Sequence, residues 1–481
     1  MSKSKSLLKN TMILGIGQFV PKIVALITLP IFTACLSTSG YGTYDLIVSF
    51  SSLFLPLLTL LIQQAVFRFI ISEKDKNNYY IYITNSLFFI FISSIFWFIV
   101  LLVGLIFFKF SFTFVILIFL FYFIQSINDV VGQIARGFGK NNLFSLGIIL
   151  FSISNLFLTL IFLYNKMLNL NTIIIILTIS YFISFIFVFL KLKVFKYINL
   201  KEISFKQIKT MLKYSIPIIP SSISLWIVNL SDRILISKFL GLSMNGIYAV
   251  ANKIPNLFGT AYSIFNLAWT ELASRSIDEE NIDEYYSDLF NSLFTFLIGA
   301  IMALITLSPI MFEILIDSKY NEGFFQMPVL FFGVFFSCLV SFYGGLYVAL
   351  SKTKKVGLSS LFGAILNFLI NILLIKKIGL YAASVSTLVS FFVIFIYRCI
   401  DLKKYINIKY NFKKIYIGIL FSVISLILFY VNNIISLLLG ILAALVYNLI
   451  FNDMFKKIIT LVFKKIKSKI WIWLFGSIFV Y

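Results

Sequence analysis

Charged side chains lie inside long apolar stretches of this sequence, where a charge is costly and therefore informative. Lys22, Arg233 and Lys253 each fall within a stretch rich in Leu, Ile, Val and Phe. A charge near the centre of a bilayer costs roughly 2.5–3.5 kcal/mol on insertion scales. Arg and Lys pair well with phosphate oxygens. If the three cations share one water-filled cavity, that cavity suits an anionic head group.

Four carboxylates in or near the same stretches, Asp45, Asp129, Asp232 and Glu271, permit a second interpretation. Asp232 and Arg233 are adjacent, so on a helix their side chains point about 100° apart and cannot both face the same direction. We expect Asp232 to pin the two halves of the protein together, and Asp129 and Glu271 are the acids to test for energy coupling. The alternative is that Asp45 or Asp232 only neutralises a neighbouring cation.

Other kinds of chemistry find little support in the residues. The sequence has no histidine, which excludes His-based catalysis and His metal ligands, and we expect no metal and no cofactor. Cys35, Cys338 and Cys399 are far apart and show neither a disulfide framework nor zinc spacing. The segment GFGK at 137–140 lacks the strand and the spacing that a phosphate loop requires.

The elements that must position these charges are membrane helices. Of 481 residues, 60% are apolar and 12% are charged, against roughly 45–50% and about 25% in soluble domains. Long uninterrupted apolar runs favour helices over a β-barrel, whose strands alternate. We predict fourteen spans, near 10–35, 43–68, 80–108, 112–135, 143–164, 171–190, 214–239, 246–271, 288–312, 324–350, 357–375, 379–399, 415–431 and 434–451.

The basic residues orient these spans. With the N-terminus in the cytoplasm, 31 of the 40 Lys and Arg fall on the inner side and only five on the outer side. Arg68, Arg136 and Lys140 then lie at the inner mouth, and both termini are cytoplasmic. The net charge of +22 follows from loops beside anionic lipid, so we expect membrane lipids and no nucleic acid as partners.

The sequence also contains an internal repeat. A shift of 204 residues aligns Leu36, Ser39, Gly42 and Tyr44 with Leu240, Ser243, Gly246 and Tyr248. Six spans separate the halves, so the halves share one orientation and form a parallel repeat. Two facing bundles would leave a central cleft and would work by rocking around it. Chance similarity between Leu-, Ile- and Phe-rich helices is the alternative.

The repeat and the spans predict five segments. They are an N-terminal six-helix bundle at 1–195, a cytoplasmic Lys-rich linker at 196–213, a C-terminal six-helix bundle at 214–402, two extra transmembrane helices at 403–452 and a cytoplasmic amphipathic tail at 453–481. We therefore expect an all-α integral membrane protein. It has no outer loop large enough for a catalytic domain.

Several motifs resemble those of the bacterial polysaccharide repeat-unit flippases, in the multidrug/oligosaccharidyl-lipid/polysaccharide exporter superfamily. DRIL at 232–235, FLG at 239–241, NGIY at 245–248 and ANKI at 251–254 resemble the family's seventh and eighth helices. The resemblance extends to LPI at 29–31, YGTY at 41–44, RF at 68–69, RGFGK at 136–140 and FNLAW at 265–269. It covers the whole chain in layout and about 8–275 in motifs.

This resemblance implies a protein that is not an enzyme. It would flip an undecaprenyl-diphosphate-linked oligosaccharide across the bacterial cytoplasmic membrane, from the inner to the outer leaflet, by alternating access. The glycan would serve a surface polysaccharide such as O-antigen, lipopolysaccharide or capsule, and other polysaccharide assembly proteins are candidate partners. The family's cationic cavity maps onto Lys22, Arg233 and Lys253.

Three alternatives stay open at this point. A lipid-linked peptidoglycan precursor flippase or a drug or cation antiporter of the same superfamily would share the fold, although a cationic cavity suits anions better than drug cations. An integral-membrane glycosyltransferase or polysaccharide polymerase is a different class, disfavoured by the short outer loops. A purely structural membrane partner is disfavoured by the costly charges inside the spans.

Overall fold

All regular structure in the described part of the chain is helical. The computed structural model describes residues 3–460 apart from 74, 76–77, 109–110, 277–280 and 458. Within these residues there is no strand, and this confirms the all-α membrane fold expected from the apolar runs. Most of the expected amphipathic tail, 461–481, lies outside the described residues.

The chain forms two compact units. Unit 1 comprises Met1–Lys253 with Leu315–Asn321 and Asn371–Leu380, and unit 2 comprises the remaining segments. The elements of unit 1 are α1 Lys3–Cys35, α2 Thr38–Thr59, α3 Ile62–Ser72, α4 Tyr79–Phe108, α5 Phe112–Gly137, α6 Asn141–Tyr164, α7 Leu170–Leu192, η2 Val194–Tyr197, η3 Leu200–Glu202, α8 Phe205–Ser215, η4 Ile216–Ile218, α9 Ile219–Phe239 and α10 Leu242–Ala251.

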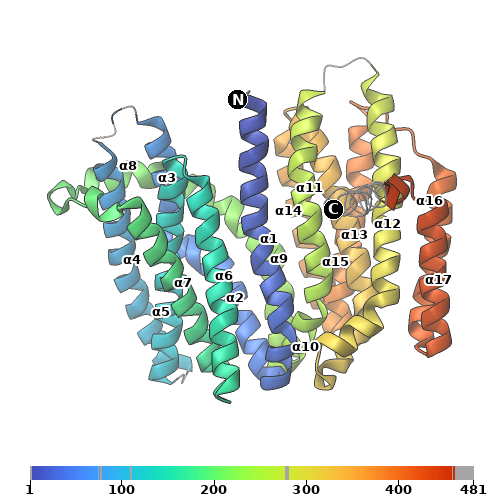
Figure 1. Cartoon of the computed structure of the whole chain (residues 1–481), viewed down its shortest axis with the longest axis horizontal. Coiled ribbons are helices and arrows are strands. Elements are labelled where there is room, and N and C mark those ends of the chain that lie inside the picture. The colour runs from blue at the N-terminus through green and yellow to red at the C-terminus, as the bar shows by residue number, and fades with distance from the viewer. Residues whose placement is uncertain are drawn as a thin grey trace, which may run out of the picture. The chain divides into compact units, whose positions relative to one another are not determined.

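Helix packing in unit 1 follows from its apolar surfaces. In Figure 1, α4, α5, α7 and α6 run side by side, while α8 lies across one end of α3 and α4. Buried aliphatic side chains from α3, α4, α5 and α7 form one continuous core, to which α8 adds Met211. Elsewhere in the unit, α1 packs against α6, and α2 against α9 and α10.

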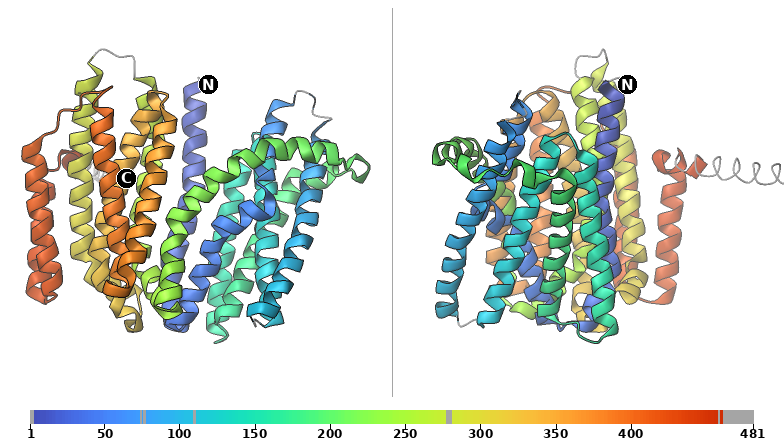
Figure 2. Two further views of the ribbon diagram at one scale, coloured as in Figure 1. Left: turned by 180° about the vertical axis from the view of Figure 1, so that it is seen from behind. Right: turned by 60° about the vertical axis from the view of Figure 1, so that its left-hand side comes forward.

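The remaining helices lie wholly or mostly in unit 2. They are α11 Lys253–Arg275, α12 Ile282–Leu315, η5 Ser318–Gln326, α13 Met327–Ala349, α14 Thr353–Ile378, α15 Tyr381–Leu402, α16 Phe412–Val431 and α17 Ile434–Ile450. Trp269 stacks on Phe342 with 4.6 Å between ring centroids, which joins α11 to α13. α16 and α17 pair with each other, and Figure 2 shows them in orange-red at the edge of unit 2.

Two of the predicted spans are broken. The span near 43–68 divides into α2 and α3 because Leu60 and Leu61 adopt positive φ angles of 45° and 55°. The span near 246–271 divides at Asn252 into α10 and α11. Pro255 explains the second break, since proline is tolerated in the first turn of a helix but not in its interior. Lys253 therefore begins a helix instead of lying inside one.

Each predicted span still contains a helix, but the helices are unequal. Ten described helices are long and apolar enough to cross a membrane: α2, α4–α7, α12–α16. Phe19–Cys35, Leu242–Ala251 and Ile434–Ile450 are apolar but shorter.

Candidate functional site

An ion pair inside unit 1 forms the centre of the candidate site. Arg233 Nε on α9 lies 2.6 Å from Asp45 Oδ2 on α2, and the side chains are only 17% and 6% exposed. Two charges that are mostly removed from water are costly unless each compensates the other. The two residues are 188 positions apart, so the fold and not local sequence makes this pair.

Two further cations share the neighbourhood of this pair. Lys253, the first residue of α11, is attracted by Asp45 and repelled by both Arg233 and Lys22. Its Nζ lies 6.0 Å from the centroid of the Tyr41 ring. Lys22 lies on α1 between the two prolines of that helix and is exposed. The structure thus brings Lys22, Arg233 and Lys253 into one electrostatic cluster with Asp45, which we call the cationic cluster.

A very close helix crossing positions α2 beside α9 and α10. A Cβ on Gly42 would lie 2.0 Å from the Leu242 carbonyl oxygen, and a Cβ on Gly246 would lie 2.0 Å from that of Thr38. Asn245 Nδ2 donates to the Gly42 carbonyl at 2.9 Å. Only glycine permits backbones to approach this closely. These glycines match each other in the internal repeat. The two matching segments are thus in direct contact, and this contact positions the helix that carries Asp45.

Asp232 acts electrostatically on Arg233 but makes its own hydrogen bonds to other residues. Its Oδ1 accepts a hydrogen bond of 2.7 Å from Asn371 Nδ2, and its Oδ2 accepts one of 3.3 Å from Tyr248. Asp232 is buried, and Asn371 belongs to the C-terminal half of α14. Adjacent residues thus enter separate contacts, as the helical geometry predicts. The contacts tie α9 to α10 and α14.

The remaining two acids do not join the cluster. Asp129 on α5 is half-buried and interacts electrostatically with Tyr181 on α7. Glu271 belongs to unit 2, where it accepts from Arg275 Nη2 at 2.5 Å in a pair that is 41% and 57% exposed. The environment of Asp129 is therefore the more unusual of the two for a carboxylate.

The three basic residues expected at the inner mouth have different surroundings. Arg68 on α3 and Lys140, which precedes α6, are exposed. Arg136 on α5 lies over the rings of Phe67 and Phe144, with 4.8 and 5.5 Å from its guanidinium carbon to the ring centroids. Cation–π contacts of this kind hold a guanidinium in place, so Arg136 differs from the two exposed cations.

One deeply buried cation was not predicted as such. Arg398 falls at the end of the predicted span near 379–399, and the structure buries it in α15, with 2% of its surface exposed. Its donors reach the Val340 carbonyl at 2.7 Å, the Val356 carbonyl at 3.2 Å and the Ser359 hydroxyl at 2.9 Å. Arg398 lies about one helix turn before α15 ends. Sequence alone gives no sign of its burial, because its partners lie on α13 and α14.

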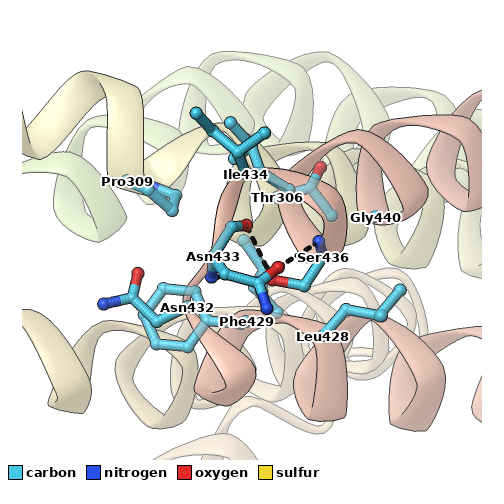
Figure 3. A pocket seen from close by; sticks show the side chains of 11 residues that line it. Thr306, Pro309, Leu428, Phe429, Asn432, Asn433, Ile434, Ser436 and Gly440 are labelled. Atoms are coloured by element: carbon cyan, nitrogen blue, oxygen red, sulfur yellow. Dashed lines mark hydrogen bonds between the residues drawn. The ribbon is translucent and has the colours of Figure 1, made fainter.

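Unit 2 also contains a pocket of about 200 Å³ between α12 and the α16–α17 turn. Figure 3 shows that Asn433 and Ser436 at its wall are hydrogen-bonded to each other, because they cap the start of α17. None of the eleven residues described as lining it carries a charge. The pocket therefore does not have the chemistry of an anion site, in contrast to the cationic cluster.

Two solved structures share the architecture. The lipid II flippase MurJ in an inward closed conformation matches with a TM-score of 0.67 and 17% identity, over 93% of this chain and 100% of that chain. An inward-facing multidrug resistance MATE transporter of the MOP superfamily matches with a TM-score of 0.59 and 17% identity, over 82% and 95%. The fold is therefore that of the MOP-type transporters.

The sequence specifies the family within this fold class. Residues 7–269 match the model of the family described as "Polysaccharide biosynthesis protein". This match covers more than half of the chain, and the chain belongs to that family. The cationic cluster lies wholly within the matched residues.

A curated relative supports the same assignment. The probable low-salt glycan biosynthesis flippase Agl15 of Haloferax volcanii is 24% identical over 284 residues. The aligned part covers 55% of this chain and 60% of the relative, so the chain spans less than two thirds of that protein. The proteins that match are named as flippases and transporters and not as enzymes.

Proposed function

We propose that this protein flips an undecaprenyl-diphosphate-linked oligosaccharide repeat unit from the inner to the outer leaflet of a bacterial cytoplasmic membrane, for surface polysaccharide synthesis. The observation that carries the proposal is the cationic cluster, in which three cations share a neighbourhood with Asp45, while Asp232 acts on Arg233 as the second carboxylate. This surplus of positive charge suits a diphosphate. The family and the relative named as a glycan biosynthesis flippase support the class of substrate.

The ion pair suggests how the site handles an anion. Without substrate, Asp45 holds Arg233 and lowers the cost of keeping a guanidinium in the membrane. An arriving diphosphate offers Arg233 a second acceptor and also pairs with Lys253 and Lys22. Substrate therefore replaces Asp45 as the partner of Arg233. Releasing the substrate in the other leaflet restores the original pair, so the site returns to its starting state.

The other acids have separate roles in this proposal. Asp232 pins α9 through Asn371 and Tyr248. Asp129 is the acid we assign to energy coupling, because it is half-buried and no basic side chain in the described part pairs with it. Glu271 is already paired with Arg275 and is the weaker candidate for coupling. Arg68 and Lys140 would attract the phosphate groups at the inner mouth.

A lipid-linked peptidoglycan precursor is the second candidate substrate. The observation in its favour is the TM-score of 0.67 to a lipid II flippase, over nearly the whole of both chains. At 17% identity this likeness concerns the fold, and the cationic cluster would suit either lipid-linked anion. The two candidates therefore differ in which glycan accumulates when the protein is removed.

Gene deletion in the host separates these functions. We expect surface polysaccharide to be lost while complete lipid-linked repeat units accumulate in the inner leaflet. Accumulation of peptidoglycan precursor instead would assign the second candidate substrate. Incomplete repeat units would indicate a glycosyltransferase, and unchanged polysaccharide would contradict both flippase proposals.

Complementation of the deletion strain tests the site itself. Lys22→Ala, Arg233→Ala and Lys253→Ala should each reduce export while the protein level stays near normal. Lys238→Ala is the matched control, because Lys238 is an exposed cation on the same helix as Arg233. If Lys22→Ala and Arg233→Ala each export normally, the cationic cluster is not the substrate site. Reporter fusions should place both termini in the cytoplasm.

A further inference from the structure

The connection between α7 and α9 is an ordered structure and not a loose linker. Near the start of α4, the buried side chains of Thr84 and Asn85 hold it by its backbone. Asn199 N donates to Thr84 Oγ1 at 2.9 Å, and Ser204 N donates to Asn85 Oδ1 at 2.8 Å. At its far end, Ser215 Oγ donates to the Leu60 carbonyl at 2.7 Å. Bonds at both ends therefore fix its position on unit 1.

The segment 195–206, which we call the lateral tip, exposes bulky apolar side chains. Leu200 is 73% exposed and Phe205 is 74% exposed, and Phe195 and Ile198 are exposed as well. All of them lie outside the predicted spans. Such a group of apolar side chains facing water would be unfavourable and marks a surface that meets another apolar phase.

Cations alternate with these apolar residues. Lys196, Lys201 and Lys206 are exposed within the lateral tip, against the single acid Glu202. In α8, Lys206, Lys209 and Lys213 share the face opposite the buried Ile208 and Met211. A helix with one basic face and flanking Phe and Leu side chains is typical of segments that lie in the membrane interface.

The position of the tip within unit 1 agrees with this chemistry. α8 runs across the helix bundle near the helix ends, and the tip projects sideways beyond α4 at that level (Figures 1 and 2). If the bundle axes follow the membrane normal, a sideways projection at this depth meets lipid head groups. Long Lys side chains can then reach the phosphates while Leu200 and Phe205 enter the boundary of the acyl chains.

We propose that the lateral tip is a binding surface for anionic phospholipid head groups, which anchors unit 1 at one face of the bilayer. The occupant we assign is the bulk anionic phospholipid, represented by phosphatidylglycerol. Phosphate chemistry accounts for the lysines, and the acyl boundary accounts for the apolar side chains between them. This surface is separate from the cationic cluster and does not depend on which glycan is transported.

The test uses the full chain in vesicles. Cys35, Cys338 and Cys399 are changed to Ala, Leu200→Cys is introduced, and an environment-sensitive fluorophore is attached there. We expect a blue-shifted emission and stronger quenching by doxyl-labelled phosphatidylglycerol than by doxyl-labelled phosphatidylcholine. Changing Lys196, Lys201 and Lys206 to Gln should reduce this preference by up to about fivefold per lysine.

A second set of variants keeps the test specific. Gln substitutions at Lys354, Lys403 and Lys409, three exposed lysines of unit 2, should leave the preference unchanged. Emission typical of water in every vesicle would overturn the proposal. Equal quenching by both lipids would overturn the anionic preference. Stronger quenching by a doxyl-labelled undecaprenyl phosphate than by phosphatidylglycerol would assign the tip to the transported lipid, which also overturns it.

Discussion

Two arginines inside membrane helices differ in what holds them. Arg398 in unit 2 donates to neutral oxygens, among them two backbone carbonyls and the hydroxyls of Ser359 and Ser360. Arg233 in unit 1 donates to a carboxylate, with Lys253 also nearby.

Backbone carbonyls cannot leave their helices, whereas a carboxylate can be replaced by another anion. We therefore expect Arg398 to join three helices permanently and Arg233 to be held reversibly. Burial alone therefore does not identify a functional cation, but its partner does.

The largest expected effect is at Arg398. Arg398→Met keeps much of the side-chain volume but removes the guanidinium's hydrogen bonds to Val340, Val356, Ser359 and Ser360. We expect a loss of about 3 kcal/mol or more in stability, seen as a lower melting temperature of the solubilised protein and a low yield. The melting temperature of Arg398→Lys should fall between those of the wild type and Arg398→Met, because an ammonium can donate but lacks the planar fork of a guanidinium. Normal melting combined with lost export would remove the distinction from Arg233.

The next effect is at Arg233 and separates transport from folding. Arg233→Ala should reduce export at least tenfold, which is about 1.4 kcal/mol, with folded protein still present. The double variant Asp45→Ala and Arg233→Ala removes both charges, so no unpaired carboxylate stays buried. We expect it to melt nearer the wild-type temperature than Arg233→Ala does while export stays low. Recovery of export in the double variant would make this ion pair structural, like Arg398.

A smaller effect is expected at the close backbone crossing of α2 and α10, which positions Asp45 beside Arg233. Gly42→Ala places a Cβ 2.0 Å from the Leu242 carbonyl oxygen, so α2 and α10 must separate. Overpacking of this kind costs about 1–3 kcal/mol. Gly104→Ala is the control, because its Cβ would meet nothing within 4 Å, and it should stabilise α4 by about 0.5–1 kcal/mol. Equal melting temperatures for the two variants would contradict the close crossing.

The smallest effect is expected at the exposed ion pair of a third arginine, Arg275, with which the effects at Arg398 and Arg233 can be compared. Arg275 pairs with Glu271 one turn away on the surface of α11. Glu271→Gln should change stability by about 0.3–0.5 kcal/mol and leave export unchanged, as measured by the same melting and complementation assays. A tenfold loss of export with normal melting would instead assign Glu271 to energy coupling.

The sequence predicts the fold class well because each apolar run is a local signal. Every predicted span contains a helix, since length and composition determine what can cross a bilayer. The break at Asn252 was less visible, because Pro255 was compatible with either a kink or a new helix start. The repeat at Gly42 and Gly246 was visible in sequence, but its direct contact in space was not.

The site could be predicted in its residue types and not in its partners. Lys22, Arg233 and Lys253 stand out because a charge in an apolar run is unusual. The bond between Asp232 and Asn371 joins residues 139 positions apart, and no spacing rule reports such a tertiary contact. Arg398 was missed for the opposite reason, since a basic residue near a helix end also suits an exposed loop.

The contact between α2 and α10 has a consequence for the origin of the fold. Gly42 meets Leu242 and Gly246, and Gly246 meets Thr38 and Gly42, with the same set of distances in both directions. Under the shift of 204 residues, Thr38 and Gly42 correspond to Leu242 and Gly246. Such reciprocity is the signature of an isologous contact across a two-fold axis, as between identical subunits. The crossing is thus what a homodimer of an ancestral half-length protein would leave behind when two copies became one chain.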